Sequence, residues 1–320
     1  MERIGFQQKE RLNDMKQILD DNRIILTEAA VVERLRRSGK VILHPRLVNA
    51  PLIYDRIGRM ALKEIYQGYM DIALEAKYPL LMCAPTWRAS RDRVLESKAR
   101  LSINGDAVGF MQTLRADQKS GQDRIKIGGL IGCKNDCYQP DQGLSASESQ
   151  AFHSWQIDQL AGAGVDFLIA QTLPHVDEAK GIARAMAGTG IPYIISFVIS
   201  RDGLILDGTD LMTAVDLIDS GTTQPPLGFM INCAYPTFLC AERQPPALFD
   251  RLIGFQANAS SLDHCDLDGS DRLEQEEVSL WGEAMMALNK AHGVKILGGC
   301  CGTSDAHLRY IVDNMDPPGV

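Results

Sequence analysis

Short runs of apolar residues alternate with longer segments of helical period along most of the chain. The apolar runs are rich in isoleucine, valine, leucine and phenylalanine, and residues such as glycine, threonine, asparagine or cysteine end them. This alternation is typical of repeated strand–helix units. Eight units predict an α/β fold in which a parallel sheet closes into a single (β/α)8 barrel, the TIM barrel. The predicted strands are Arg23–Thr27, Pro79–Ala84, Ile125–Gly132, Asp166–Gln171, Tyr193–Ile199, Gly228–Ala234, Leu252–Ala257 and Val294–Gly298.

Helical periodicity fills the intervals between the predicted strands. The predicted helices are Ala29–Arg37, Asp55–Lys77, Ser147–Ala163, His175–Ala187, Asp210–Asp219, Glu276–His292 and Ser304–Asn314. Gly164, Gly190 and Gly293 follow three of these segments, at the point where a helix commonly ends in a left-handed residue. The segment Phe6–Asp20 predicts an extra N-terminal helix ahead of the first strand.

The chain contains no proline- or serine-rich linker that would divide it. Residues 221–226 and 258–270 have the composition of loops, and neither separates two sets of strands. We therefore expect one barrel domain over residues 1–320, with residues 1–22 as a helical extension.

Composition and charge narrow the class of partners. Of the 320 residues, 45% are hydrophobic and 23% are charged, which is typical of a soluble globular protein. The net charge of −8 gives no basic field that would hold a nucleic-acid backbone. The N-terminus is polar, and no apolar run is long enough to span a bilayer. We expect a cytoplasmic protein with small-molecule partners and without nucleic-acid or membrane partners.

Polar residues gather at the carboxyl ends of the predicted strands. In a (β/α)8 barrel these ends share one rim, which carries the active site. Strand-end capping is the alternative for each residue. The candidate substrate-binding residues at this rim are Glu28, Thr86, Gln171, Asn232 and Asn258.

The strongest chemical signal is the segment Gly298-Gly299-Cys300-Cys301-Gly302-Thr303. Two adjacent cysteines reach one metal ion only if the backbone leaves strand geometry, which the flanking glycines permit. Cys233, at the end of another strand, supplies a third ligand and leaves the fourth position open, as in catalytic zinc sites. The alternatives are buried packing thiols or a disulfide between the adjacent pair. Cys133 and Cys137 form a separate CxxxC spacing that suits a redox pair, half of a metal site or plain loop thiols.

The cysteine pattern also carries a resemblance. The segment Gly299-Cys300-Cys301-Gly302-Thr303, with Ile231-Asn232-Cys233 upstream, resembles the homocysteine S-methyltransferase family, which includes betaine-homocysteine methyltransferase and the homocysteine-binding domain of cobalamin-dependent methionine synthase. Thr86-Trp87-Arg88-Ala89-Ser90 is similar to the family's Thr-Tyr-Gln-Ala-Ser. The segment Gln171-Thr172, with Glu178-Ala179, is similar to its Glu-Thr and Glu-Ala. The resemblance extends from about Arg23 to the end of the chain.

The resemblance implies a defined chemistry at the rim. It implies an eight-stranded barrel in which Cys233, Cys300 and Cys301 bind Zn²⁺. It also implies methyl transfer to the zinc-activated thiolate of an acceptor such as homocysteine. The donor is an activated methyl compound, which can be a sulfonium, a quaternary ammonium or a methylated carrier, including a separate carrier protein.

Two departures from the family pattern keep alternatives open. Glu28-Ala29-Ala30 stands where the family has Asp-Gly-Gly, and Gln171 stands where the family has the glutamate that binds the ammonium group of homocysteine. An amide accepts a hydrogen bond but supplies no charge. The hypotheses are therefore methyl transfer to homocysteine, the same chemistry on a different thiol, or a non-catalytic protein that binds zinc or a thiol.

Overall fold

The structure is a computed structural model, and it describes residues 2–263 and 274–315. The predicted loop Asn258–Ser270 lies only partly within these residues. Cys265, one of the eight cysteines of the chain, lies outside them.

Eight parallel strands form a closed barrel in which each strand pairs with its neighbours in chain order. Leu26 shows the closure, because it is in register with Leu80 on one side and with Leu297 on the other. All eight predicted strands are confirmed, and their ends move by two residues at most. The strands are β1 (Ile25–Thr27), β2 (Leu80–Cys83), β3 (Ile125–Gly132), β4 (Phe167–Leu173), β5 (Tyr193–Phe197), β6 (Gly228–Ala234), β7 (Leu252–Ala257) and β8 (Ile296–Gly299).

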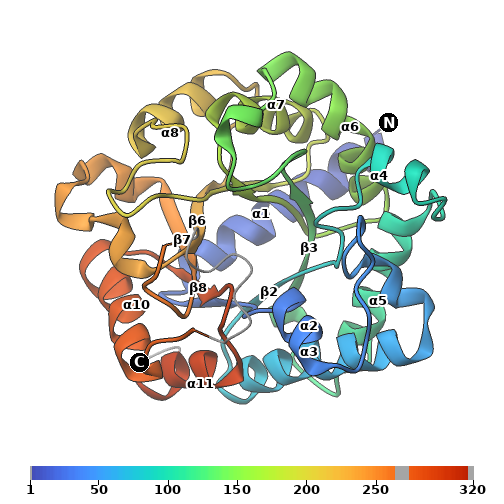
Figure 1. Ribbon diagram of the computed structural model, residues 1–320, viewed down its shortest axis with the longest axis horizontal. Helices are drawn as coiled ribbons and strands as arrows, with labels where there is room; N and C mark the ends of the chain where they lie inside the picture. Colours follow the sequence, from blue (N-terminus) through green and yellow to red (C-terminus); the bar gives the residue numbers. More distant parts are fainter. Residues whose placement is uncertain (1, 264–273, 316–320) are drawn as a thin grey trace.

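Helices surround the barrel (Figure 1). The predicted helices are confirmed, and their ends shift by a few residues. Two further helices, α4 and α5, were missed between β2 and β3. The α-helices are α1 (Glu2–Asp21), α2 (Val32–Ser38), α3 (Arg56–Glu75), α4 (Arg91–Glu96), α5 (Ile103–Ala116), α6 (Ala146–Gly162), α7 (Val176–Ala187), α8 (Leu211–Ser220), α10 (Val278–His292) and α11 (Asp305–Asp313). Short 3-10 turns are η1 (Ala50–Tyr54), η2 (Gln122–Arg124), η3 (Pro140–Gln142), η4 (Pro236–Leu239), η5 (Ala241–Arg243) and η6 (Pro246–Asp250).

Helix α1 lies across the amino-terminal end of the barrel, behind the strands in Figure 1. Met15 of this helix is buried and belongs to the same apolar cluster as the strand residues Phe167, Ile194 and Ile296. Lys126 at the start of β3 forms an ion pair of 2.8 Å with Asp14. The predicted N-terminal helix therefore closes one end of the barrel, and the carboxyl ends of the strands remain open at the other.

Among the described helices, none combines the length and the apolar character that crossing a membrane would require.

Candidate active site

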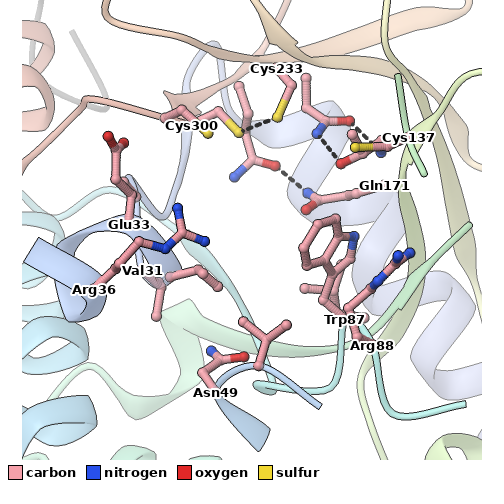
Figure 2. A pocket seen from close by; sticks show the side chains of 18 of the residues that line it. Val31, Glu33, Arg36, Asn49, Trp87, Arg88, Cys137, Gln171, Cys233 and Cys300 are labelled. Carbon is pink, nitrogen blue, oxygen red and sulfur yellow. Dashed lines mark hydrogen bonds between the residues drawn. The ribbon is translucent and has the colours of Figure 1, made fainter. Parts of the chain in front are cut away.

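A cavity of about 1040 Å³ opens at the carboxyl ends of the strands. Most of the residues expected at this rim line it, namely Glu28, Gln171, Asn232, Cys233, Asn258, Cys300 and Cys301. Figure 2 shows Cys233 and Cys300 together at one end of the cavity, with Gln171 nearby. These residues are far apart along the chain, and the structure places them together at the carboxyl ends of the strands, as the sequence predicted.

The three cysteines form the cluster that could hold a metal ion in the described chain. Their Sγ atoms all lie within 4.8 Å of one another. The Sγ atoms of Cys233 and Cys300 are 2.8 Å apart. Cys233 is buried, Cys300 is half-buried and Cys301 is exposed, so the cluster faces the cavity from one side.

The backbone around the adjacent pair explains how both thiols face one point. A side chain at Gly298 would place its Cβ 2.4 Å from Cγ2 of Thr27, so the chain passes closely over β1 only because this residue is glycine. The Cys300 N–H donates to the carbonyl of Ala257 at 2.7 Å, and the carbonyl of Cys301 accepts from the Ala259 N–H at 2.9 Å. These bonds fix the peptide groups of the pair against the end of β7.

Cys233 reaches the same point through an irregularity in β6. Its φ is 55°, in the left-handed region that residues with side chains rarely adopt. The pairing with β7 shifts register between Asn232 and Ala234. A regular strand would alternate these side chains between the two faces of the sheet. The shift turns the thiol of Cys233 toward Cys300 and Cys301.

The cluster fits a single tetrahedral metal ion. Zn–S bonds of about 2.3 Å place the sulfur atoms of such a site about 3.8 Å apart. The three Sγ atoms lie within 4.8 Å of one another, and a shared ion would require the 2.8 Å separation of Cys233 and Cys300 to widen by about 1 Å. Within the cluster, the hydrogen bond with Cys233 is the largest cause that raises the pKa of the Cys300 thiol well above its ordinary value. A divalent cation would offset the mutual repulsion of the three thiolates, and this donor set leaves one coordination position for an external ligand.

Asn232 connects β6 to the adjacent strand β5 and to β4 beyond it. Its Oδ1 accepts from the Thr172 N–H and from the Ser196 hydroxyl, both at 2.8 Å. Its Nδ2 donates to Oγ1 of Thr172 at 2.8 Å. Thr172 also has a positive φ, 60°, at a register shift in β4. The side chain of Asn232 therefore holds the irregular ends of β4 and β6 together, immediately before Cys233.

Replacing Asn232 by alanine is expected to weaken metal binding roughly 10- to 100-fold, the range typical of partners that orient metal ligands. The variant loses three hydrogen bonds that fix the backbone beside Cys233. Competition with a chromogenic chelator measures the affinity. Asn22→Ala, at the opposite end of the barrel, is the control. Asn232→Asp keeps the two bonds to Oδ1 and should recover part of the loss. An Asn232→Ala protein that binds metal as tightly as the parent would exclude this role.

The cavity wall near the cysteines is built from neutral groups. The carboxyl group of Glu28 is buried and accepts from the Cys83 N–H at 2.9 Å. Burial raises its pKa from 4.5 to about 8, although the hydrogen bond from Cys83 lowers it. Nε2 of Gln171 donates to Oε1 of Gln256, and Gln256 donates to the Glu28 carbonyl at 3.3 Å. Near neutral pH this part of the wall carries mostly uncharged hydrogen-bonding groups.

The two remaining candidates differ in their position. Thr86 is buried behind the cavity, where its hydroxyl donates to the Leu130 carbonyl at 2.7 Å and ties the loop after β2 to β3. Asn258 lines the cavity. Its Oδ1 is buried and has no hydrogen-bond partner among the described residues, so it offers an acceptor to a bound molecule.

The loop after β3 contributes Tyr138, which sequence reasoning did not select, and Cys137, which it considered only as part of a CxxxC pair. Cys137 and Tyr138 both line the cavity. Tyr138 lines the same cavity as the thiol cluster, and the charge of Cys233 is the largest cause that raises the pKa of its hydroxyl. Cys133 is buried, and neither it nor Cys137 belongs to the three-thiol cluster. The sequence signal here was the CxxxC spacing, and it directed attention to the thiols instead of the aromatic ring that follows them.

Comparison with known proteins agrees with this geometry. The family model described as "Homocysteine S-methyltransferase" matches residues 18–315. Homocysteine S-methyltransferase YbgG of Bacillus subtilis is 23% identical, over 94% of this chain and 97% of its own length. Bovine betaine–homocysteine S-methyltransferase 1 is 24% identical, over 93% of this chain and 74% of its own.

The fold is also shared with a solved structure. The homocysteine methyltransferase MmuM from Escherichia coli, in its metallated form, superposes with a TM-score of 0.74 at 19% identity. The alignment covers 94% of this chain and all of that one. Since the family model spans nearly the whole barrel, the chain belongs to the homocysteine S-methyltransferase family and is a methyltransferase.

Proposed function

We propose that the protein is a zinc-dependent S-methyltransferase, which moves a methyl group from an activated donor to the sulfur of a small thiol. One observation carries the proposal, namely the three sulfur atoms within 4.8 Å of one another at the wall of an open cavity. Family membership supports the reaction class. The metallated form of MmuM, which shares the fold, supports metal as part of it.

The ligand set accounts for activation of the acceptor. A free alkyl thiol has a pKa near ~8.5 and is mostly protonated at neutral pH, whereas the thiolate is the nucleophile. Zinc at Cys233, Cys300 and Cys301 would supply a Lewis acid that holds the acceptor sulfur as thiolate at the open position. The thiol proton leaves to solvent.

The protein residues orient the two substrates for a direct displacement. The acceptor sulfur attacks the methyl carbon, a new S–C bond forms, and the bond from the methyl group to the donor sulfur or nitrogen breaks. The electron pair of that bond leaves with the donor. The cavity of about 1040 Å³ can hold an acceptor and a small donor together. Proximity and exclusion of water are therefore the main contributions of the surrounding chain.

Purified protein kept under reducing conditions is expected to contain about one zinc ion per chain. Elemental analysis measures it. Incubation with a thiol and a donor should then yield the S-methylated thiol, detected by mass spectrometry. Betaine and S-methylmethionine, which appear in the names of relatives, are the first donors to test. A fully reduced protein that neither contains nor takes up zinc would contradict the proposal. Zinc without turnover, over a broad set of donors, would favour a non-catalytic thiol-binding protein.

A further inference from the structure

Arginine side chains crowd the cavity beyond the thiol cluster. The charged residues that line the cavity come from the loop after β1, from α2 and the loop after it, from the loop after β2, from α4, from the loop after β3 and from the segment before α10. The arginines are Arg36, Arg37, Arg46, Arg88 and Arg93, and the acids are Glu28, Glu33, Asp136 and Glu274. The pairing of these charges decides which of them can act on a bound molecule.

Two of the five arginines are neutralised by carboxylates. Arg37 pairs with Glu33 at 3.0 Å, and Arg46 pairs with Glu96. The other three, Arg36, Arg88 and Arg93, form no ion pair with a carboxylate within the described chain. Figure 2 shows Arg36 and Arg88 on facing walls of the cavity.

Arg88 and Arg93 are held mainly by backbone carbonyls, and Arg88 also has a long contact of 3.9 Å with the Cys133 Sγ. Nη1 of Arg88 donates to the carbonyls of Cys133 and Asn135, both at 2.8 Å. Arg93 donates to the carbonyls of Lys134 at 3.1 Å and Arg46 at 3.3 Å. Both side chains are half-buried, and burial followed by the charge of Arg88 lowers the pKa of Arg93. Two partly desolvated positive charges are thus fixed near each other, and neither forms a direct ion pair within the described chain, since the nearby Glu96 pairs with Arg46.

The segment that holds these arginines also reaches the thiol cluster. Residues 133–135 accept from Arg88 and Arg93, and Tyr138, a few residues further on, lines the same cavity as Cys233. The guanidinium of Arg88 also stacks on the Trp87 ring, 5.1 Å from its centroid. Arg88 and Arg93 line the same cavity as the cysteines, so a molecule whose sulfur lies at the cysteines can reach this positive wall.

Beside Gln171, the described inner wall offers no free carboxylate to an ammonium group. Glu33, which accepts from the Gly302 N–H next to Cys301, is already paired with Arg37. Gln171 is an amide engaged with Gln256, and the Glu28 carboxyl retains its proton near neutral pH. The exposed Asp136 accepts from the Tyr138 N–H, and Glu274 is exposed at the rim. An amino thiol would have to bring its cation next to unpaired arginines.

We propose that the acceptor is a thiol that carries an anionic group, either carboxylate, sulfonate or phosphate, which Arg88 and Arg93 bind from one wall and Arg36 from the other. This inference rests on the proposed function, because it assigns the substrate class of the same site. Guanidinium groups bind such anions through charge-assisted, often bidentate hydrogen bonds. Nε and Nη2 of Arg88, which donate no hydrogen bond within the described chain, remain available for them.

Thiols of similar length and different charge test the proposal. Mercaptopropionate, mercaptoethanol and cysteamine are titrated into the cobalt-substituted protein, and the cobalt–thiolate absorption gives each dissociation constant. Mercaptopropionate is expected to bind about tenfold more tightly than mercaptoethanol, and cysteamine more weakly than both. Mercaptoethanesulfonate and a phosphorylated thiol, titrated in parallel, identify which anion is preferred.

Arg88→Gln removes the charge while keeping a hydrogen-bonding side chain. It is expected to reduce the preference for mercaptopropionate over cysteamine about tenfold and to leave the affinity for mercaptoethanol unchanged. Arg91→Gln is the matched control, because Arg91 is an exposed residue of α4 outside the cavity lining. Gln171→Glu should act in the opposite direction, by strengthening cysteamine binding and weakening mercaptopropionate binding.

The outcomes separate the two proposals. Equal affinities for the three thiols, or an unchanged preference in Arg88→Gln, would overturn the anionic-acceptor proposal while leaving thiol activation intact. A protein whose cobalt spectrum responds to none of the thiols would overturn the proposed function together with this inference. Loss of mercaptoethanol binding in Arg88→Gln would overturn the anionic-acceptor proposal, because it would show that Arg88 maintains the fold of the site and does not bind the anionic group of the acceptor.

Discussion

Cys300→Ser is expected to lose its metal ion and with it methyl transfer. Cys300 is central to the cluster, since its Sγ lies 2.8 Å from that of Cys233 and its N–H anchors the pair to Ala257. Serine keeps the backbone bond but replaces a soft thiolate by a hydroxyl, which is a poor zinc ligand at neutral pH. The zinc content should fall from about one per chain to near zero. The affinity should fall by more than the roughly 100-fold that an outer partner of a metal site contributes.

Cys240→Ser provides the control for this experiment. Cys240 is half-exposed, and its Sγ accepts from Arg243 outside the cluster. Its replacement removes one thiol from the chain and should leave the zinc content unchanged. Retention of zinc by Cys300→Ser would show that the three sulfur atoms are not the binding site. Thermal unfolding of the zinc-depleted parent distinguishes loss of a ligand from loss of the fold.

Glu28→Gln is expected to stabilise the protein increasingly as the pH rises from about 5 to 8. The folded carboxyl group retains its proton up to a pKa of about 8, whereas in the unfolded chain it ionises above 4.5. Ionisation therefore favours the unfolded state across this window, and each pKa unit corresponds to about 1.4 kcal/mol. Glutamine does not ionise, and its Oε1 can still accept from the Cys83 N–H. The gain in free energy of unfolding should reach about 3 to 5 kcal/mol near pH 8 and vanish below pH 4.5.

Thermal melts of the two proteins at several pH values measure this difference. Glu283→Gln, on the exposed side of α10, is the matched control and should show a small, pH-independent change. A melting-temperature difference for Glu28→Gln that stays constant between pH 5 and 8 would contradict the buried, protonated state.

Much of the fold could be predicted because strand and helix leave different periodicities in the sequence. The eight apolar runs were recognised since every strand is buried on both faces, as in β4, where all seven residues are buried. Helix α5 was missed although Ile103, Val108 and Met111 are buried on one side. Its two glycines, Gly105 and Gly109, lower the helical propensity and weaken the pattern. Helix α4 has only six residues, which is too short to show a period.

The candidate site could be predicted only as far as strand ends define it. The cysteines and Asn258 lie at carboxyl ends of strands, and the barrel brings these ends together without further information. The bonds from Asn232 to Thr172 and Ser196 depend on register shifts in β4 and β6 that no residue pattern reveals. Thr86 follows the same strand-end rule, but its hydroxyl points away from the cavity toward Leu130.

The positive wall of the cavity could not be predicted for a different reason. Arg88 was visible in a segment similar to the family pattern, but its partners are the carbonyls of Cys133 and Asn135, more than forty residues further along the chain. Arg93 lies on the missed helix α4. Backbone carbonyls are identical in every sequence, so an arginine that binds them leaves no complementary residue to recognise.

The hydrogen bonds of Asn232 have a consequence for redesign of the acceptor pocket. Residue 171 lines the cavity from β4, and the next residue, Thr172, is hydrogen-bonded to Asn232, which precedes a cysteine of the cluster. A substitution that changes acceptor selectivity at position 171 can therefore also weaken metal binding, because Thr172 and Asn232 link this position to Cys233. In a library that randomises positions 171 and 172, we expect the largest differences in activity to come from differences in zinc content. Turnover with a new thiol should accordingly be compared only among variants that hold equal amounts of metal.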